Sequence, residues 1–458
     1  MPMISSLEIS RIGPAAGVIA AYAAFCLRIW HGHRKRAAAH NASGADAVLV
    51  AFASQSGFGR ELAEEAATAL ESTGVGVRLC ALDALDAAGL KACRQALFIA
   101  STCGEGDAPD NAARFVKRTM ELEPSLAELR YGLLALGDAT YTNYCGFGRR
   151  LDAWLEACGA TPMFPRIDID RADGDALATW RHRLAAFAGL AELPESALPA
   201  LGFWRLRNQR HLNPGSAGEP AWHVELEAVD SDGPDARPVP LPDWQAGDLL
   251  QLHPSGEGSP PRDYSIASLP EDGAVHLLVR RVRGPDGNPG LMSAQLTDTS
   301  GTVPVLRGRI RPHPNFRIGD NAGRPLILIG NGTGLAGLLA HLRLRARRND
   351  GRNWLIFGER NKAFDDFHGA EIEALERQDL LARCDRVYSR DEPAEYVQDR
   401  LAGAADTVRA WVDGGAAIYV CGNAVGMGPA VHETLLAILG SERLERLAHE
   451  GRYRRDIY

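Results

Sequence analysis

The sequence lacks closely spaced pairs of cysteines. Its eight cysteines, at positions 26, 80, 93, 103, 145, 158, 384 and 421, include no Cys-x-x-Cys pair and no spacing typical of a zinc site. We interpret them as scattered thiols of a reducing compartment. The thirteen histidines show no ligand cluster in the sequence either, so we assign no residue to a metal. The sequence also has no excess of positive charge, because it contains 50 lysines and arginines and 58 aspartates and glutamates. This balance argues against a general nucleic-acid-binding protein.

One uncharged segment near the N-terminus indicates a membrane anchor. Residues 12–27 carry no charge and would span about 24 Å as a helix, short of a ~30 Å hydrocarbon core unless Arg28 snorkels and residues 29–30 are included. A basic cluster follows at residues 31–36, so the positive-inside rule places the later residues in the cytoplasm. We predict a single-pass protein of the inner (cytoplasmic) membrane with cytoplasmic catalytic domains. An amphipathic or buried N-terminal helix is the alternative.

The rest of the chain shows three patterns. At roughly 100–200 residues per domain, 458 residues allow about two to four domains. Apolar runs that end in glycine-containing loops predict buried strands of a parallel α/β sheet, at residues 47–52, 96–100 and 133–136. Residues 203–318 alternate short strands with proline and glycine turns, which predicts a small antiparallel barrel. The α/β pattern then returns, with buried runs at residues 326–329, 354–357 and 417–420.

Three loops of the first α/β region carry small, hydroxyl and polar residues. The first is Ser54, Gln55, Ser56, Gly57, Phe58 and Gly59. The second contains Ser101, Thr102, Cys103 and Gly104, and the third Leu136, Gly137, Asp138, Tyr141, Asn143, Tyr144 and Cys145. Backbone N–H groups and hydroxyls at a helix start make a phosphate cradle, and without a lysine the first loop favours a monophosphate over ATP. A tight structural turn is the alternative for that loop. Together, the three loops can surround a planar ring and its phosphate.

These motifs resemble those of a known protein family. Residues 47–160 resemble the flavodoxin-type FMN domain of the diflavin reductases, the family of NADPH–sulfite reductase flavoprotein and NADPH–cytochrome reductase. The resemblance implies that the first loop holds the FMN phosphate and that the other two line the isoalloxazine ring. Tyr141 falls at the outer stacking aromatic, whereas Cys103 stands where the family usually has tyrosine.

Residues 262–265 resemble the Arg-x-Tyr-Ser signature of the family's FAD barrel, although alone they also fit an ordinary strand end. The signature implies that Arg262 donates to a pyrophosphate, Tyr264 packs on the flavin and Ser265 reaches its N5 edge. Gly-x-x-Ser at residues 290–293 resembles the helix start that contacts the same pyrophosphate. The implied FAD site is Arg262, Asp263, Tyr264, Ser265, Leu278, Val279, Arg280, Gly290, Leu291, Met292, Ser293 and Tyr458.

A glycine-rich turn follows the apolar run at residues 326–329. Alone it also fits close strand–helix packing, but it resembles the family's Gly-x-Gly-Thr-Gly contact with the nicotinamide nucleotide. Ser389, Arg390 and Tyr396 resemble the family's clamp on the NADPH 2′-phosphate, which favours NADPH over NADH. The implied NADP site is Gly332, Thr333, Gly334, Ser389, Arg390, Tyr396, Gln398 and Cys421.

The last functional prediction concerns a buried cysteine and the chain end. A cysteine at the end of a buried strand is ordinarily an inert thiol, but the family's Tyr-Val-Cys-Gly context places Cys421 beside the nicotinamide C4. In the family, a terminal aromatic covers the FAD ring, and an aspartate two residues earlier joins the hydride path. The implied catalytic residues are Ser265, Cys421, Asp456 and Tyr458.

We therefore predict an α/β multidomain protein with an N-terminal transmembrane helix. Its units are an anchor and linker (1–44), a flavodoxin-like FMN domain (45–190), a linker (191–202), an antiparallel β-barrel FAD domain (203–320) and a Rossmann-like NADP(H) domain (321–458). Only about 70 residues separate residues 190 and 262, so the helical connecting domain usual in the family is expected to be missing or nearly so.

The predicted function is NADPH-dependent diflavin reduction, with electrons passing from NADPH to FAD, to FMN and to a one-electron acceptor. The expected acceptor is a haem protein of the sulfite reductase or cytochrome type. Two alternatives stay open: a membrane reductase for quinone or chelated ferric iron, and a flavin redox sensor without turnover.

Overall fold

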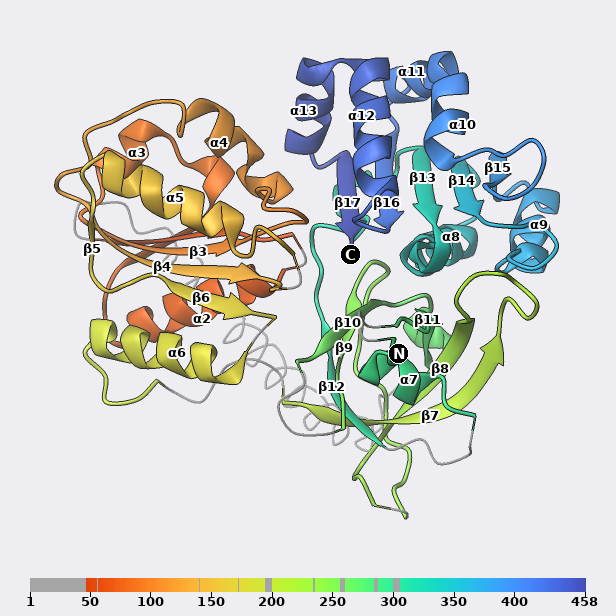
Figure 1. Ribbon diagram of the computed structural model, residues 1–458, viewed down its shortest axis with the longest axis horizontal. Coiled ribbons are helices and arrows are strands. Elements are labelled where there is room, and N and C mark those ends of the chain that lie inside the picture. The colour runs from red at the N-terminus through yellow and green to blue at the C-terminus, as the bar shows by residue number, and fades with distance from the viewer. Residues whose placement is uncertain are drawn as a thin grey trace, which may run out of the picture.

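The computed structural model describes residues 47–55, 57–139, 141–171, 173–193, 200–233, 235–255, 260–283, 287–299 and 305–458. Their strands form three sheets, and Figure 1 shows each sheet with its helices as a separate unit. The anchor predicted at residues 12–27 lies outside the described residues, as do residues 194–199 of the predicted linker.

The first sheet is parallel and occupies the red-to-yellow unit of Figure 1. Its strands are β1 (Val48–Ala53), β2 (Val77–Ala81), β3 (Gln95–Ser101), β4 (Arg130–Gly137), β5 (Thr161–Pro162) and β6 (Ile167–Asp170). The strand order is β2-β1-β3-β4-β5, and β6 also pairs with β4. Strand β1 is buried along its whole length, as expected where helices cover both faces of a parallel sheet. The three strands predicted for this region are present.

Helices cover this sheet on both faces (Figure 1). They are α2 (Phe58–Ser72), α3 (Ala87–Lys91), α4 (Ala113–Arg118), α5 (Gly146–Ala157) and α6 (Gly174–Ala188). Phe98 of β3 packs in a core with Phe115 and Phe147 of α4 and α5. Its neighbour Leu97 packs with Trp180 of α6 on the opposite face, because successive strand residues point to opposite sides.

The second sheet is antiparallel, with order β10-β9-β12-β7-β8-β11. Its strands are β7 (Gly202–His211), β8 (Ala221–Val229), β9 (Leu249–His253), β10 (Arg262–Ser265), β11 (Val275–Arg280) and β12 (Leu306–Arg311), and helix α7 (Leu291–Leu296) accompanies them. Val224 and Leu277 point into the sheet's own core. Ala221 and Leu278 point the other way, into the core of the third unit. The two units therefore share a packed interface.

The third sheet is parallel, with order β15-β14-β13-β16-β17. Its strands are β13 (Leu326–Asn331), β14 (Asn353–Glu359), β15 (Arg383–Tyr388), β16 (Ala417–Gly422) and β17 (Tyr453–Ile457). Its helices are α8 (Leu335–Arg347), α9 (Gly369–Arg377), α10 (Val397–Gly403), α11 (Ala405–Asp413), α12 (Met427–Leu439) and α13 (Ser441–His449). The three strands predicted here are present, whereas β15 and the C-terminal β17 were not predicted from the apolar pattern.

Two further features of the described chain bear on the predictions. Between α6 and β10, the described residues contain strands but no helix. Nowhere in the described ranges is a helix both long enough and apolar enough to cross a membrane.

Candidate functional site

The first predicted cofactor loop joins β1 to α2. Ser54 is buried, and its Oγ accepts a hydrogen bond from the backbone N–H of Gly57 at 3.1 Å. Gly57 has a φ of 93°, which glycine adopts without steric cost, and α2 begins at the next residue. A Cβ on Gly59 would lie 2.9 Å from Ser101 Oγ, so a larger residue would crowd the second loop. A helix start built from such small residues suits a phosphate. The predicted Ser56 lies outside the described residues.

The second loop is a tight turn after β3. Cys103 and Asp107 exchange backbone hydrogen bonds of 2.9 Å in both directions. The N–H of Thr102 donates to the Leu136 carbonyl at 2.8 Å and so ties this loop to the end of β4. Burial raises the pKa of the Cys103 thiol to about 12. A neutral thiol therefore occupies the position at which the family usually has tyrosine.

The third loop runs from the end of β4 into α5 and contacts the second. Asn143 Nδ2 donates to the Glu105 carbonyl at 2.9 Å. A Cβ on Gly137 would lie 2.8 Å from the backbone nitrogen of Cys145, so the loop start requires glycine. The same loop carries the partly exposed Asp138, Tyr141 and Tyr144. The three predicted loops thus meet at the carboxyl ends of β1, β3 and β4, the usual ligand position of a parallel sheet.

The Arg-x-Tyr-Ser motif forms β10, at one edge of the antiparallel sheet. Arg262 and Tyr264 are partly buried and pair with alternate residues of β9, whereas Ser265 is buried. Asp263 accepts hydrogen bonds from Gln251 at 3.2 Å and from Arg311. Its carboxylate is thus engaged within the protein.

The Gly-x-x-Ser motif precedes and begins the short helix α7. Ser293 Oγ donates to the Gly290 carbonyl at 2.9 Å and accepts from the N–H of Val282 at 3.3 Å. Three of the predicted FAD residues have side chains packed in apolar cores, namely Leu278, Val279 and Met292. Any contact that they make with a cofactor is therefore limited to their backbone or to the outer edge of the side chain.

The predicted catalytic residues come together from three strands and the chain end. Ser265 Oγ on β10 donates to Asp456 Oδ2 on β17 at 2.7 Å, and Cys421 Sγ on β16 lies 3.6 Å from the same oxygen. All three residues are buried. Burial and then the neighbouring Asp456 raise the pKa of Cys421 well above its ordinary value, so the thiol stays protonated. Tyr458 is half-exposed, and its hydroxyl lies 3.4 Å from Thr333 Oγ1.

The glycine-rich turn lies next to these residues, at the start of α8. Gly332 has a φ of 56°. A Cβ on Gly334 would lie only 2.2 Å from the Cys421 carbonyl oxygen, so this position accepts no side chain. The sequence motif is thus explained by the close approach of the turn to β16.

The predicted 2′-phosphate residues lie near the opposite edge of the third sheet, beyond the carboxyl end of β15. The N–H of Ser389 donates to the Glu359 carbonyl at 2.9 Å, and that of Arg390 to the Arg360 carbonyl at 2.8 Å. Both follow the end of β15, where Arg390 is exposed. Tyr396 caps the N-terminus of α10 and is also exposed, with Gln398 in the first turn of that helix.

The flavodoxin-like unit packs against β17 through a charged contact that the sequence did not reveal. Arg455 Nε donates to Asp110 Oδ2 at 2.9 Å, and Gln55 Nε2 donates to the same carboxylate at 3.1 Å and to the Arg455 carbonyl at 3.0 Å. Burial alone would raise the pKa of Asp110, but the Arg455 guanidinium lowers it below its ordinary value. This contact brings the first cofactor loop to the strand that carries Asp456.

Two further contacts join the flavodoxin-like unit to the antiparallel one. Arg309 on β12 pairs with Glu61 on α2 at 2.7 Å. Asn315 Nδ2, in the connection to β13, donates to the Ser54 carbonyl at 3.0 Å. The partners of these side chains are far away in the sequence, so no local motif indicated them.

Sequence reasoning also missed a group of potential metal ligands. His223, Glu225 and His276 bring one ligand atom each to within 4.8 Å of one another. The available signal was the alternation His-x-Glu on β8, which places both side chains on one face of the strand.

Comparison with known proteins agrees with this arrangement. Residues 50–181 match the family model of flavodoxin, and residues 328–433 match that of the oxidoreductase NAD-binding domain. Similar proteins include the sulfite reductase [NADPH] flavoprotein alpha-component of Neisseria meningitidis serogroup C / serotype 2a, which is 27% identical over 90% of this chain and 89% of the relative. The proteins of the same name from Vibrio parahaemolyticus and Aliivibrio fischeri are each 26% identical over 92% of this chain, covering 88% and 91% of their own lengths.

The chain belongs to the diflavin reductase family. As a diflavin reductase, it is an NADPH-dependent flavoprotein oxidoreductase, and the cofactors predicted from the sequence, FMN, FAD and NADPH, are confirmed. The alignment with the Neisseria protein has 546 positions, but 90% of this 458-residue chain is only about 412 residues. About 134 aligned positions of that relative thus have no counterpart in this diflavin reductase.

The prediction of a single-pass inner-membrane protein is wrong. The relatives align over nearly the whole diflavin reductase and are named as flavoprotein components of sulfite reductase. In the described part of the chain, no helix is able to span a membrane. The uncharged stretch that suggested the anchor lies outside that part, and at about 24 Å it was already short of a hydrocarbon core.

Proposed function

We propose that this diflavin reductase passes electrons from NADPH through FAD to FMN and then singly to a haem protein of the sulfite reductase type. The observation that carries the proposal is the arrangement on β17. Asp456 contacts Ser265 and Cys421, while the adjacent Arg455 holds the flavodoxin-like unit through Asp110. One strand thus links the predicted hydride site to the predicted FMN site.

We assign FMN to residues 45–190, FAD to residues 203–320 and NADPH to residues 321–458. The close approach at Gly59 and the start of α2 suit the FMN phosphate. Arg262 and the turn before α7 suit the FAD pyrophosphate. The turn at Gly334, which leaves no room for a side chain, suits a nucleotide backbone approaching the start of α8.

The flavins, when bound, accept a hydride equivalent and release electrons one at a time. The side chains of the protein orient the reacting groups and determine which of them carry a proton. Asp456 accepts from the Ser265 hydroxyl and holds it in one orientation. The Cys421 thiol stays protonated beside that carboxylate, so it adds no second negative charge to the site. The Tyr458 hydroxyl lies 3.4 Å from Thr333 Oγ1, and the half-exposed side chain can move aside without disturbing a core.

The proposed acceptor follows from the relatives, which are named as components of an NADPH-dependent sulfite reductase. Two exposed carboxylates of the second loop, Glu105 and Asp107, lie at the edge of the proposed FMN site. They support docking of a partner through a basic face.

Anaerobic titration and reconstitution test this function. The full chain, loaded with both flavins, should take up about four electrons from NADPH, two per flavin. It should then reduce the haem component of a sulfite reductase, as shown by the haem absorption spectrum. Flavins that NADPH cannot reduce would contradict the whole proposal. Reduction of the flavins and of a quinone or ferric chelate, but not of the haem, would contradict the proposed acceptor only.

A further inference from the structure

Three histidines meet where the antiparallel sheet packs on the third unit. His223 lies on β8, His276 on β11, and His368 precedes α9. The ring of His223 lies 4.9 Å from that of His276 and 5.1 Å from that of His368, centroid to centroid. His223 is only 7% exposed. None of these residues belongs to the predicted flavin or nucleotide sites.

A chain of hydrogen bonds orients His223. Arg343 donates to both carboxylate oxygens of Glu371, at 2.7 and 2.8 Å. His368 Nδ1 lies 2.9 Å from Glu371, and because a carboxylate only accepts, His368 Nδ1 is the donor. In a neutral His368 ring, Nε2 is then an acceptor, and it lies 3.2 Å from His223 Nδ1. His223 thus donates through Nδ1 and keeps a lone pair on Nε2.

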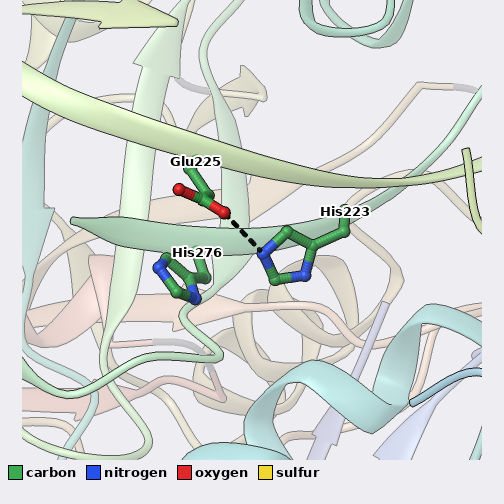
Figure 2. A group of neighbouring side chains, drawn as sticks. All are labelled: His223, Glu225 and His276. Atoms are coloured by element: carbon green, nitrogen blue, oxygen red, sulfur yellow. Dashed lines mark ion pairs between the residues drawn. The ribbon is translucent and has the colours of Figure 1, made fainter. Parts of the chain in front are cut away.

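That lone pair faces a carboxylate. Figure 2 shows His223 and Glu225 turned toward each other, with Nε2 and Oε1 separated by 3.7 Å. This distance is too long for a hydrogen bond. Glu225 Oε1 also accepts a hydrogen bond from Asn208 Nδ2 at 3.2 Å. Two acceptors therefore face each other, an arrangement that a cation between them would satisfy.

His276 supplies a third donor atom to the same position. It pairs with Glu225 across β8 and β11, and its ring lies beside both other side chains (Figure 2). Its Nδ1 is buried and has no hydrogen-bond partner among the described residues. A buried imidazole nitrogen without a partner is unfavourable unless a ligand satisfies it.

We propose that His223, Glu225 and His276 bind a divalent transition-metal ion of the zinc class. Two imidazole nitrogens and one carboxylate oxygen are a donor set that Zn²⁺ accepts, with a fourth position for water. Metal bonds of about 2.0–2.1 Å imply ligand atoms about 3.3 Å apart, so atoms that now lie within 4.8 Å of one another must approach more closely. Glu225 is partly exposed and can move to provide it.

The surroundings of the site are consistent with binding. Burial lowers the pKa of His223, which favours the neutral ring that a metal ligand needs. The His368–Glu371 pair has the form of the outer hydrogen bonds that orient metal-bound histidines. Arg343 adds a positive charge nearby, but it is paired with Glu371; Arg210 also lies close enough to lower the pKa of His223.

The role expected of the ion is structural. All three ligands belong to the antiparallel sheet, whereas His368 and Glu371 belong to the third unit. An ion that fixes His223 would thus strengthen the contact between the two units. His276 lies four residues before Arg280, about 13 Å along β11 at ~3.3 Å per residue. The ion would therefore be separate from the nucleotide turn that Arg280 approaches.

Calorimetric titration of the full chain with ZnCl2 tests the proposal, using flavin-loaded protein after dialysis against EDTA. Wild-type protein should bind one equivalent and show a higher Tm with zinc. His276→Ala and the isosteric Glu225→Gln should each weaken binding by at least about 100-fold, and His368→Ala by about 10- to 100-fold. His182→Ala, which removes an exposed imidazole on α6, is the matched control and should bind as wild type.

The zinc X-ray absorption spectrum adds a test that does not depend on folding of the variants. It should show imidazole and oxygen scattering. Three results would each overturn the proposal: no stoichiometric binding by wild type, unchanged binding by folded Glu225→Gln and His276→Ala, or sulfur scattering from a cysteine site.

Discussion

Arg455 and Asp456 are adjacent residues of β17, and their side chains make contacts on opposite sides of that strand. Arg455 pairs with Asp110 of the flavodoxin-like unit, and Asp456 accepts a hydrogen bond from Ser265 of the antiparallel unit. Because consecutive strand residues point in opposite directions, one short strand reaches both units. The third unit thereby joins the two predicted flavin sites.

The ion pair of Asp110 and Arg455 should stabilise the docked position of the flavodoxin-like unit. Asp110→Asn is expected to cost about 1.5–3 kcal/mol of contact free energy, because it weakens charge-assisted hydrogen bonds to a largely buried arginine. Electron delivery to an acceptor such as cytochrome c should slow, whereas flavin reduction by NADPH should stay at the wild-type rate. Stopped-flow measurements separate the two steps.

The control for that variant is Lys117→Met, which removes an exposed ion pair with Glu445 between the same two units. Its effect on stability should stay within about 0.5 kcal/mol. If Lys117→Met slowed electron delivery as much as Asp110→Asn, the partly buried pair of Asp110 and Arg455 would not be the main contact between the units.

The same contact should depend on pH. Arg455 holds the pKa of Asp110 below its ordinary value, so the folded carboxyl titrates below about 3.9, the value in an unfolded chain. The stabilisation is therefore fully present above that pH and is lost as the pH falls through the folded pKa. The Tm difference between wild type and Asp110→Asn should be constant near neutral pH and shrink toward pH 3. A difference that grew on acidification would contradict the sign of this linkage.

Asp456→Asn should slow the hydride step. The variant replaces the carboxylate that orients the Ser265 hydroxyl and lies beside the Cys421 thiol. We expect flavin reduction by NADPH to fall by about 10²-fold, the lower range for a positioned acid–base group. Stopped-flow reduction with NADPH deuterated at C4 checks this, since the isotope effect should increase as hydride transfer becomes limiting. Unchanged affinity for NADP⁺ would show that the nucleotide site is intact.

Tyr458→Ala should lower the KM for NADH. If the terminal ring must leave before nicotinamide can stack, removing it increases the fraction of binding-competent protein. NADH lacks the 2′-phosphate contact, so its KM should fall by roughly tenfold, while the rate with saturating NADPH gains little. Tyr458→Phe keeps the ring and loses only the contact with Thr333, so it should behave as wild type. Equal KM values for NADH in wild type and Tyr458→Ala would contradict this role.

Gly334→Ala should abolish the nucleotide turn. Its Cβ would lie 2.2 Å from a backbone oxygen of β16, which cannot move without disturbing a buried strand. We expect loss of NADPH-dependent flavin reduction, with the flavodoxin-like unit still binding FMN. Gly403→Ala on α10, where a Cβ meets nothing within 4 Å, is the matched control and should be neutral or slightly stabilising.

Much of the fold and of the site could be predicted from local patterns. The strand before Ser54 and the strand before Gly332 are short apolar runs that end in glycine-rich loops, and both are present. The strand β17 could not be predicted in this way, because its sequence is mostly polar and charged. Its pairing with β16 and its contacts on both sides stabilise it instead.

The membrane prediction failed for a related reason. A run of uncharged residues is only a statement of composition, and it does not decide whether the segment crosses a bilayer. The alignment with sulfite reductase flavoprotein components corrected it.

By itself, the sequence determined the family and the three cofactors, because these depend on motifs of a few adjacent residues. Only the tertiary structure decided that Asp110 meets Arg455, 345 residues away, and that His223, Glu225 and His276 surround one point. Such contacts depend on how whole sheets pack against one another. Burial selects those packings through the summed apolar surface of many residues, and no local pattern encodes which polar side chains then come together.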